Sequence, residues 1–486
     1  MNTNLAEGDP VLEKTETITQ ALPGPFAGLS MNCRACHLIK EQMSLGRGIR
    51  AYTDFARRSP IPIREDGKTR TVRNAPAMVN ALIVRTGETF LHLDGEFANG
   101  PDLVKGTFTG RNFGWLPGEQ KQAIRHIARV IREDDGKGLL AAEFGGYPYR
   151  TVFKSSEGAV SEEYEVVDEY RLDVTTASDE QVFGALAKAL DAYMTSLFFS
   201  RNSQVEYDGS PYDVFLEKNE VPRKIVFGQE PSYYSRNVLS VVTNIPAIRF
   251  VSPADNCYRL LKMEFRFNKA ELEGMKIFFT RSGPGKRGIG NCIACHTPPD
   301  FTDFQFHNTG VSQEEYEVVH GKGAFSKLVI PGLAVRNRSF DKFLPANLQH
   351  PRANGPFLDI PDAAHPERAD LGLWNVFGNP AQPSVQKTLR ETLDPERKQS
   401  DEQLLEKTIG CFKTPGLRGL AMSAPYMHNG SRDTVEDVIR FYIKASRQAR
   451  AGEIRNADPE LGKIFVTDDD IEFLAAFLKA LNEDYE

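Results

Sequence analysis

The sequence lacks the features that mark membrane, nucleic-acid-binding and disulfide-stabilised proteins. No apolar run approaches the roughly 18 residues that a membrane helix needs, so no membrane insertion is expected. The 59 basic residues are outnumbered by 66 acidic ones, and this net charge of −7 argues against a nucleic-acid-binding role. Six cysteines in 486 residues are too few for a disulfide scaffold. With 40% apolar residues, the chain is expected to be soluble with a sizeable core.

Four of the six cysteines form two CxxC pairs, and a histidine follows each pair directly. The motifs are Cys33-Arg-Ala-Cys36-His37 and Cys292-Ile-Ala-Cys295-His296. This is the spacing of c-type haem attachment, in which both thiols bond to the haem and the histidine ligates its iron. The sequence therefore predicts two covalently bound haem c groups.

Two other interpretations of these cysteines remain open. Zinc could bind all four CxxC cysteines, although it would not require a histidine after each pair. A thioredoxin-like redox pair would need a βαβ context that the sequence lacks. The lone Cys257 and Cys411 are expected to be small buried apolar residues, and a disulfide between them is the alternative.

The cellular location follows from the haem motifs. The N-terminal residues have no basic segment and no apolar segment, so they do not form a signal peptide. Covalent haem attachment takes place in the bacterial periplasm or an equivalent compartment. We therefore expect a periplasmic protein from which a signal has been removed.

Apolar periodicity predicts a mainly helical protein. Helices are expected over residues 119–133, after the capping pair Ser178 and Gln181, and after the capping pair Asn268 and Glu271. Two more are expected at the C-terminus, around residues 435–442 and 467–481. Residues 67–118 are predicted to form ordered loops and turns, residues 135–176 a loop with a hairpin, and residues 331–400 a long loop around Trp374 that wraps another part of the molecule.

Three segments carry a resemblance to a known family. They are residues 410–442, which include Pro425-Tyr-Met-His-Asn-Gly430, then Phe306-His-Asn-Thr-Gly310, and Arg73-Asn-Ala-Pro76 before Asp94-Gly95. Together they resemble the bacterial dihaem cytochrome c peroxidase and MauG family. The resemblance covers most of the chain and leaves about 135–255 as an insertion. It implies two cytochrome c-like domains with long loops, at residues 1–265 and 266–486.

The resemblance implies different roles for the two haems. The N-terminal haem reacts with hydrogen peroxide, and the C-terminal haem is six-coordinate and stores or relays oxidising equivalents. The family's peroxidases place a methionine ligand 14 residues after the motif histidine, His428 here, and that position is Tyr442, as in the MauG branch. A phenolate stabilises highly oxidised iron, whereas a thioether favours the reduced state. Tyr442 as a core residue is the alternative, with Met422, Met427 or His428 as the ligand.

The resemblance also implies a calcium ion between the haems. The side chain of Asn74 and the backbone carbonyls of Ser423 and Pro425 are its implied ligands. Oxygen ligands in loops suit this hard cation. The alternative for Asn74 is a turn residue.

The sequence departs from the family at several positions. Leu93 stands where many members have a tryptophan between the haems, so Trp115, Trp374 or a tyrosine is left as a substitute. The position of the distal acid falls near Phe113. No histidine occurs between His37 and His92, so a histidine that caps the oxidised N-terminal iron is not expected, unless His92 itself ligates. An uncapped ferric iron would react with peroxide without prior reduction.

These features lead to a hypothesis about mechanism. Peroxide binds the iron above His37, and His92 and Glu96 are the candidate groups that shuttle its proton. A core role for His92 is the alternative. Each haem gives up one electron, aided at the C-terminal haem by Tyr442, and the equivalents pass to an electron donor or an oxidisable partner protein.

Three rival functions remain open. The first is a cytochrome c peroxidase that takes electrons from a small cytochrome or copper protein. The second is a dihaem electron-transfer protein without peroxide chemistry, which would need a strong sixth ligand on both irons. The third is a structural zinc protein.

Overall fold

The computed structural model describes most of the chain and leaves out part of its N-terminal region. The described residues are 12–14, 29–31, 58, 61, 64–83, 90–137, 141, 145–155, 158–226, 229–255, 265–281 and 287–483. Helices dominate this part, so the mainly α fold is confirmed. Within these ranges, no helix combines the length and the apolar composition required to cross a bilayer.

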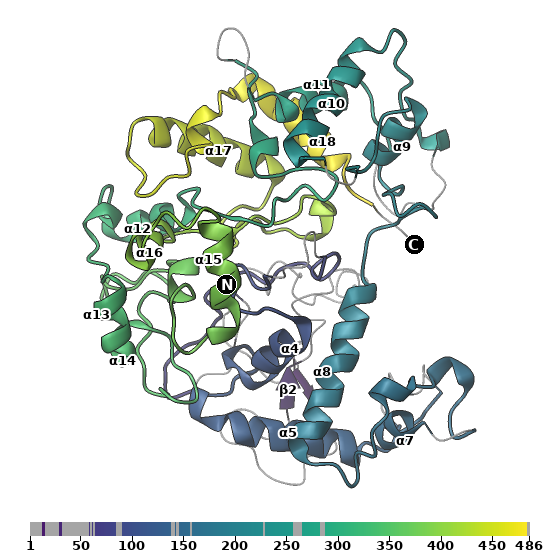
Figure 1. Ribbon diagram of the computed structural model, residues 1–486, viewed down its shortest axis with the longest axis vertical. Coiled ribbons are helices and arrows are strands. Elements are labelled where there is room, and N and C mark those ends of the chain that lie inside the picture. Colours follow the sequence, from purple (N-terminus) through teal and green to yellow (C-terminus); the bar gives the residue numbers. More distant parts are fainter. Residues whose placement is uncertain are drawn as a thin grey trace.

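The elements follow one another as short helices joined by long loops (Figure 1). The helices of the first half are α4 (Gly100–Thr109), α5 (Gln120–Glu133), α7 (Tyr149–Lys154), α8 (Asp179–Ser196), α9 (Pro211–Lys218) and α10 (Pro231–Asn244). Those of the second half are α11 (Lys269–Phe279), α12 (Val311–His320), α13 (Leu333–Arg338), α14 (Phe340–Phe343), α15 (Pro383–Leu393), α16 (Asp401–Lys407), α17 (Val435–Arg450) and α18 (Ile471–Lys479). Two antiparallel strand pairs complete the list: β1 (Leu12–Lys14) with β2 (Leu29–Met31), and β3 (Phe306–His307) with β4 (Phe412–Lys413).

The largest hydrophobic core lies among α9, α10, α11, α17 and α18, at the top of Figure 1. The predicted capping box of Asn268 and Glu271 starts α11 and is confirmed. A Cβ at Gly274 would lie 1.8 Å from the carbonyl oxygen of Phe473, so this glycine permits the close contact of α11 with α18. This core draws on residues from both sides of the expected boundary at 265/266, and the division into two domains stays a prediction.

A second core surrounds Trp374 and corrects the prediction for residues 331–400. This stretch contains α13, α14 and α15 and is not one long loop. Trp374 is fully buried, and the guanidinium of Arg336 on α13 lies 4.8 Å from its ring centroid. Arg336 Nη2 also donates to the carbonyl oxygen of Phe377, 2.7 Å away. Helices therefore form here because they pack on a buried aromatic side chain.

The first half differs from prediction at two places. Residues 67–118 are not all loop, because Asn99 caps α4 and a proline follows in its first turn. A Cβ at Gly100 would clash with the side chain of Asp191 on α8. This glycine, which resembles a loop residue in the sequence, therefore permits close packing of α4 on α8. Residues 135–176 form α7 and two 3-10 turns in their described part, with no hairpin there. The expected helix over 119–133 is confirmed as α5, and the capping box of Ser178 and Gln181 as the start of α8.

Candidate functional site

A cavity of about 450 Å³ lies at the centre of the second half of the chain. Cys292, Cys295, His296 and Tyr442 all line it, although Tyr442 is distant from the other three in sequence. Its volume falls within the range of pockets that hold organic cofactors. The residues predicted to hold the C-terminal haem therefore line a single cavity.

Local backbone geometry fixes the cysteine motif at the cavity wall. A 3-10 turn runs over Cys292–Ala294 and begins after Asn291, which has a left-handed φ of 51°. The Asn291 amide donates to the carbonyl oxygen and the carboxylate of Glu460, each at 3.0 Å. These contacts tie the turn to the loop before α18.

The orientation of His296 suits a haem ligand. Its Nδ1 lies 3.0 Å from the carbonyl oxygen of Phe301, and since a carbonyl only accepts, Nδ1 carries the proton. Nε2 is then the nitrogen with a lone pair for a metal, an arrangement usual in metal-bound histidines. Burial lowers the pKa of His296, which favours the neutral ring that ligation requires. The donor set therefore fits a covalently attached haem c.

Tyr442 reaches the cavity from α17. Thr434 caps this helix, whose Val435, Val438 and Ile439 line the same wall. Burial raises the pKa of the Tyr442 phenol, so a nearby cation such as ferric iron would be needed to ionise it. Met427 and His428 line the cavity as well, so geometry alone leaves these alternative ligands open.

His428 is a buried side chain with an unused nitrogen. It is 7% exposed, and its Nε2 has no hydrogen-bond partner among the described residues. Its ring stacks on Phe412 with centroids 3.7 Å apart. Burial lowers the pKa of His428 to about 3, so the ring is neutral. A buried nitrogen without a partner, on a residue that lines the cavity, fits a site that binds a cofactor.

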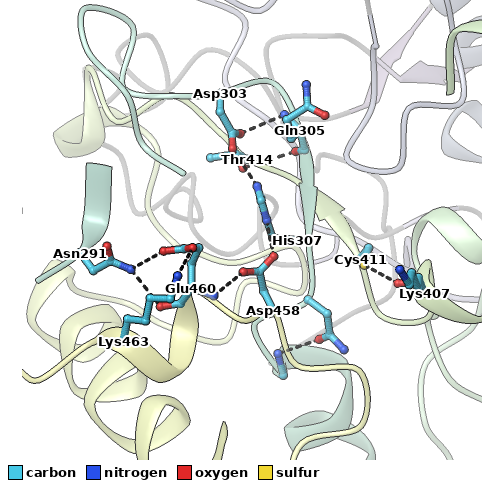
Figure 2. Close-up of polar contacts among 12 residues, drawn as sticks. Asn291, Asp303, Gln305, His307, Lys407, Cys411, Thr414, Asp458, Glu460 and Lys463 are labelled. Carbon is cyan, nitrogen blue, oxygen red and sulfur yellow. Dashed lines mark hydrogen bonds and ion pairs between the residues drawn. The ribbon is translucent and has the colours of Figure 1, made fainter. Parts of the chain in front are cut away.

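Figure 2 shows the imidazole of His307 held between the carboxylates of Asp303 and Asp458. His307 Nδ1 lies 2.6 Å from Asp458 Oδ2, and its Nε2 lies 2.8 Å from Asp303 Oδ2. Burial lowers the pKa of His307, but the two carboxylates outweigh burial and raise it well above its ordinary value. The ring is therefore an imidazolium that donates from both nitrogens.

The two predicted N-terminal motif segments meet the second half through Arg73. Its guanidinium forms a two-point ion pair with Asp370 and donates to Asp94 Oδ2 at 2.5 Å. It also lies 5.3 Å from the ring centroid of Phe412. This buried network holds the Asp94 loop against β4.

His92 and Glu96 lie together beside that network. His92 Nδ1 is 3.2 Å from Glu96 Oε2, and Glu96 Oε1 accepts from Gln382 Nε2 at 3.2 Å. Burial opposes ionisation of Glu96, but the interaction with His92 lowers its pKa below the ordinary value. His92 also lines the cavity and has a left-handed φ of 63°. The pair has the composition of a proton relay.

The expected calcium ligands Asn74 and Pro425 are in contact. Asn74 Nδ2 lies 2.5 Å from the Pro425 carbonyl oxygen, and Asn74 Oδ1 is buried without a partner among the described residues. The two ends of an amide exchange by rotation. With Oδ1 turned toward Pro425, a cation between the two oxygens would offset their repulsion. Ser423 lines the same cavity, and oxygen donors of this kind are the ligands that calcium prefers.

The remaining residues that the sequence singled out have different outcomes. The first haem motif, Cys33, Cys36 and His37, lies outside the described residues, as does Cys257. Cys411 is buried and its thiol donates to the Lys407 carbonyl oxygen. Leu93 lines the cavity, whereas neither tryptophan is among its lining residues. Trp115 lies near His126, and Phe113 stacks on Phe108.

The sequence did not predict the two ion pairs of His307. It also did not predict that Asp300 and Arg418 line the cavity. The sequence offered one signal, the Phe306-His-Asn-Thr-Gly310 motif, but none for the acidic partner 151 positions away.

No protein-family model matches the chain. The chain is 28% identical over 195 residues to cytochrome-c peroxidase IdrP2 of Denitromonas iodatirespirans, covering 40% of this chain and 37% of that protein. It is 23% identical over 257 residues to cytochrome-c peroxidase IdrP1 of Pseudomonas sp. (strain SCT), covering 51% and 47%. Each match spans less than half of the relative's length.

Two solved structures are similar over most of their length. The diheme peroxidase BthA from Burkholderia thailandensis E264 has 16% identity and a TM-score of 0.46, over 97% of this chain and 89% of that chain. A MauG-like protein associated with microbial copper homeostasis has 17% identity and a TM-score of 0.43, over 93% and 84%.

Proposed function

We propose that the chain is a member of the bacterial dihaem cytochrome c peroxidase and MauG family, and that it is a periplasmic peroxidase with two haem c groups. Cys33, Cys36 and His37 would hold the haem that meets hydrogen peroxide. Cys292, Cys295, His296 and Tyr442 would hold the second haem. The observation that carries the proposal is the shared cavity of His296 and Tyr442.

When bound, the haem iron would supply one-electron redox chemistry and react with peroxide. The chain's own residues prepare this chemistry. His296 presents Nε2 because Phe301 holds Nδ1. Tyr442 would provide a hard anionic oxygen once a bound cation ionises its phenol, and such a ligand favours higher oxidation states over ferrous iron. We propose on this basis that the second haem shares the oxidising equivalents.

We propose that His92 and Glu96 transfer the proton at the peroxide bound to the first haem, although His92 also lines the cavity assigned to the second haem. Their 3.2 Å contact joins a base of lowered pKa to an imidazole. Such a pair can take a proton from one oxygen of the peroxide and return it to the other oxygen, which assists cleavage of the O–O bond. Calcium at Asn74, Ser423 and Pro425 would fix this loop against the C-terminal segment.

The names of the curated relatives favour a second candidate, a cytochrome c peroxidase supplied by an electron-donor protein. One experiment separates the two. The fully ferric protein is mixed with one equivalent of hydrogen peroxide, and optical and EPR spectra are recorded. Rapid loss of both ferric signals without prior reduction supports the MauG-like function. A reaction that requires prior reduction of one haem supports the second candidate, and no reaction in either state contradicts both.

A further inference from the structure

Tyr207 lies behind the wall of the haem cavity, in the segment between α8 and α9. Its side chain is 3% exposed, and its hydroxyl donates to Asp300 Oδ1 at 2.6 Å. Asp300 lines the cavity and follows His296 by four residues. One side chain therefore separates the phenol from the space that would hold the second haem.

The hydrogen bonds of Tyr207 orient its hydroxyl hydrogen toward Asp300. The phenolic oxygen accepts from Arg201 Nη2 at 2.9 Å and from Asn80 Nδ2 at 3.1 Å. Because both neighbours are donors, the hydroxyl hydrogen points to the carboxylate. Asp300 forms no ion pair with a basic side chain in the described ranges, and its Oδ1 is the acceptor to which the proton of Tyr207 could move.

Two guanidinium groups lie against the Tyr207 ring. Arg418 is 3.8 Å and Arg201 is 4.7 Å from the ring centroid. Arg418 is neutralised by a two-point ion pair with buried Asp213, at 2.9 Å for both contacts. Nearby cations disfavour loss of an electron from the ring. A strong oxidant is therefore needed, and release of the proton to Asp300 keeps the product uncharged.

We propose that Tyr207 is a redox-active tyrosine that holds one oxidising equivalent outside the haems. One electron passes from Tyr207 to the oxidised haem c at Cys292 and Cys295, which hydrogen peroxide generates. The O–H bond of Tyr207 breaks, an O–H bond forms on Asp300, and the products are a neutral tyrosyl radical and a carboxylic acid. One electron from a reductant, with return of the proton, restores the starting state. This inference rests on the proposed function.

Tyr234 provides a matched control of similar burial. It is 1% exposed, and its hydroxyl donates to the Pro222 carbonyl oxygen at 2.8 Å. A carbonyl does not take up a proton at neutral pH, so this phenol lacks the base that Tyr207 has. Tyr234→Phe and Tyr207→Phe remove the same atom from equally buried sites.

The test is freeze-quench EPR of the ferric holoprotein after addition of hydrogen peroxide. Wild-type protein containing ring-deuterated tyrosine is expected to give a narrowed organic radical signal. The signal is expected to vanish in Tyr207→Phe, persist in Tyr234→Phe, and fall by about tenfold in Asp300→Asn, equivalent to about 1.4 kcal/mol. Haem content and the resting ferric spectrum are compared first for each variant.

The outcomes separate this inference from the function on which it rests. Ferric signals that do not respond to peroxide would contradict both. Ferric signals that respond without a tyrosyl signal, or with a signal that survives in Tyr207→Phe, contradict the inference alone. If Tyr207→Phe does not bind haem, Asp300→Asn decides, because it retains the phenol: loss of the radical supports the inference and an undiminished radical contradicts it.

Discussion

Arg73 forms a two-point ion pair with Asp370, with N–O distances of 2.6 and 2.8 Å, across 297 positions of sequence. Burial disfavours an ionised Asp370, but Arg73 outweighs this and lowers the pKa of that carboxyl. The same guanidinium binds Asp94, so one side chain joins the loop before α4 to the core around Trp374. Asn74 and Leu93, which adjoin Arg73 and Asp94 in sequence, line the cavity.

Replacing Arg73 by methionine is expected to destabilise the holoprotein by about 3 to 5 kcal/mol, because it leaves two buried carboxylates unpaired. Denaturant unfolding followed by circular dichroism measures the change. Arg397→Met, which removes an exposed ion pair with Glu391, is the control and is expected to stay within about 0.5 kcal/mol of wild type. Equal effects of the two substitutions would show that the Arg73 network is not structural.

The His307 ion pairs predict a pH-dependent stability. The folded pKa of His307 is raised above its unfolded value of about 6.5, so its stabilising contribution is complete below about pH 6.5 and declines as the pH rises above it. The difference in unfolding free energy between wild type and His307→Gln is therefore expected to shrink from pH 6 to pH 9. His350→Gln, which removes a partly exposed pair with Asp341, is the control. A difference that stays constant or grows with pH contradicts the assignment of an imidazolium.

Calcium is expected to stabilise the protein through Asn74. Calcium at about 100 times its dissociation constant would add about 2.7 kcal/mol, so the unfolding temperature should rise on addition of calcium and fall on chelation. Asn74→Ala should abolish most of this response, whereas Asn244→Ala, on the exposed end of α10, should retain it. Scanning calorimetry with calcium, magnesium or chelator measures the effect. An undiminished calcium response in Asn74→Ala would remove this residue from the site.

The cysteine motifs predict the haem content. Wild type should carry two covalent haems per chain, and the double variant Cys292→Ala, Cys295→Ala should carry one. Cys411→Ala is the control, because this buried thiol donates to a backbone carbonyl and is expected to leave the haem count unchanged. The pyridine haemochrome absorbance per polypeptide gives the count. Two haems in the double variant would exclude the second motif as an attachment site.

The sequence predicted the elements whose signals are local. The capping box of Asn268 and the apolar positions Leu272, Met275 and Phe279 define α11 within a short stretch, and all three side chains are buried. The helix α4 was missed because Gly100 resembles a turn residue, whereas it permits close contact with Asp191 of α8. Local sequence does not predict the contact of Gly100 with Asp191, because the two residues are far apart in the chain.

The same distinction applies to the candidate site. Spacing predicted the cysteine motif and its histidine, and the resemblance to a family predicted Tyr442; the structure places these side chains around one cavity. The ion pair of His307 with Asp458 was not predicted, because these residues are 151 positions apart and only the fold brings them together. The hydrogen bond from Tyr207 to Asp300 was not predicted either, because the two residues are 93 positions apart.

The ligand of the second haem is the central claim, and the spectrum of Tyr442→Phe tests it most directly. Tyr426 offers a matched control, because it lines the same cavity and its hydroxyl donates to the Leu420 carbonyl oxygen at 2.8 Å. EPR and resonance Raman spectra of the ferric proteins are compared. Tyr442→Phe is expected to lose the tyrosinate-ligated haem signal while retaining both haems, and Tyr426→Phe to match wild type. A wild-type haem spectrum in Tyr442→Phe would contradict the account.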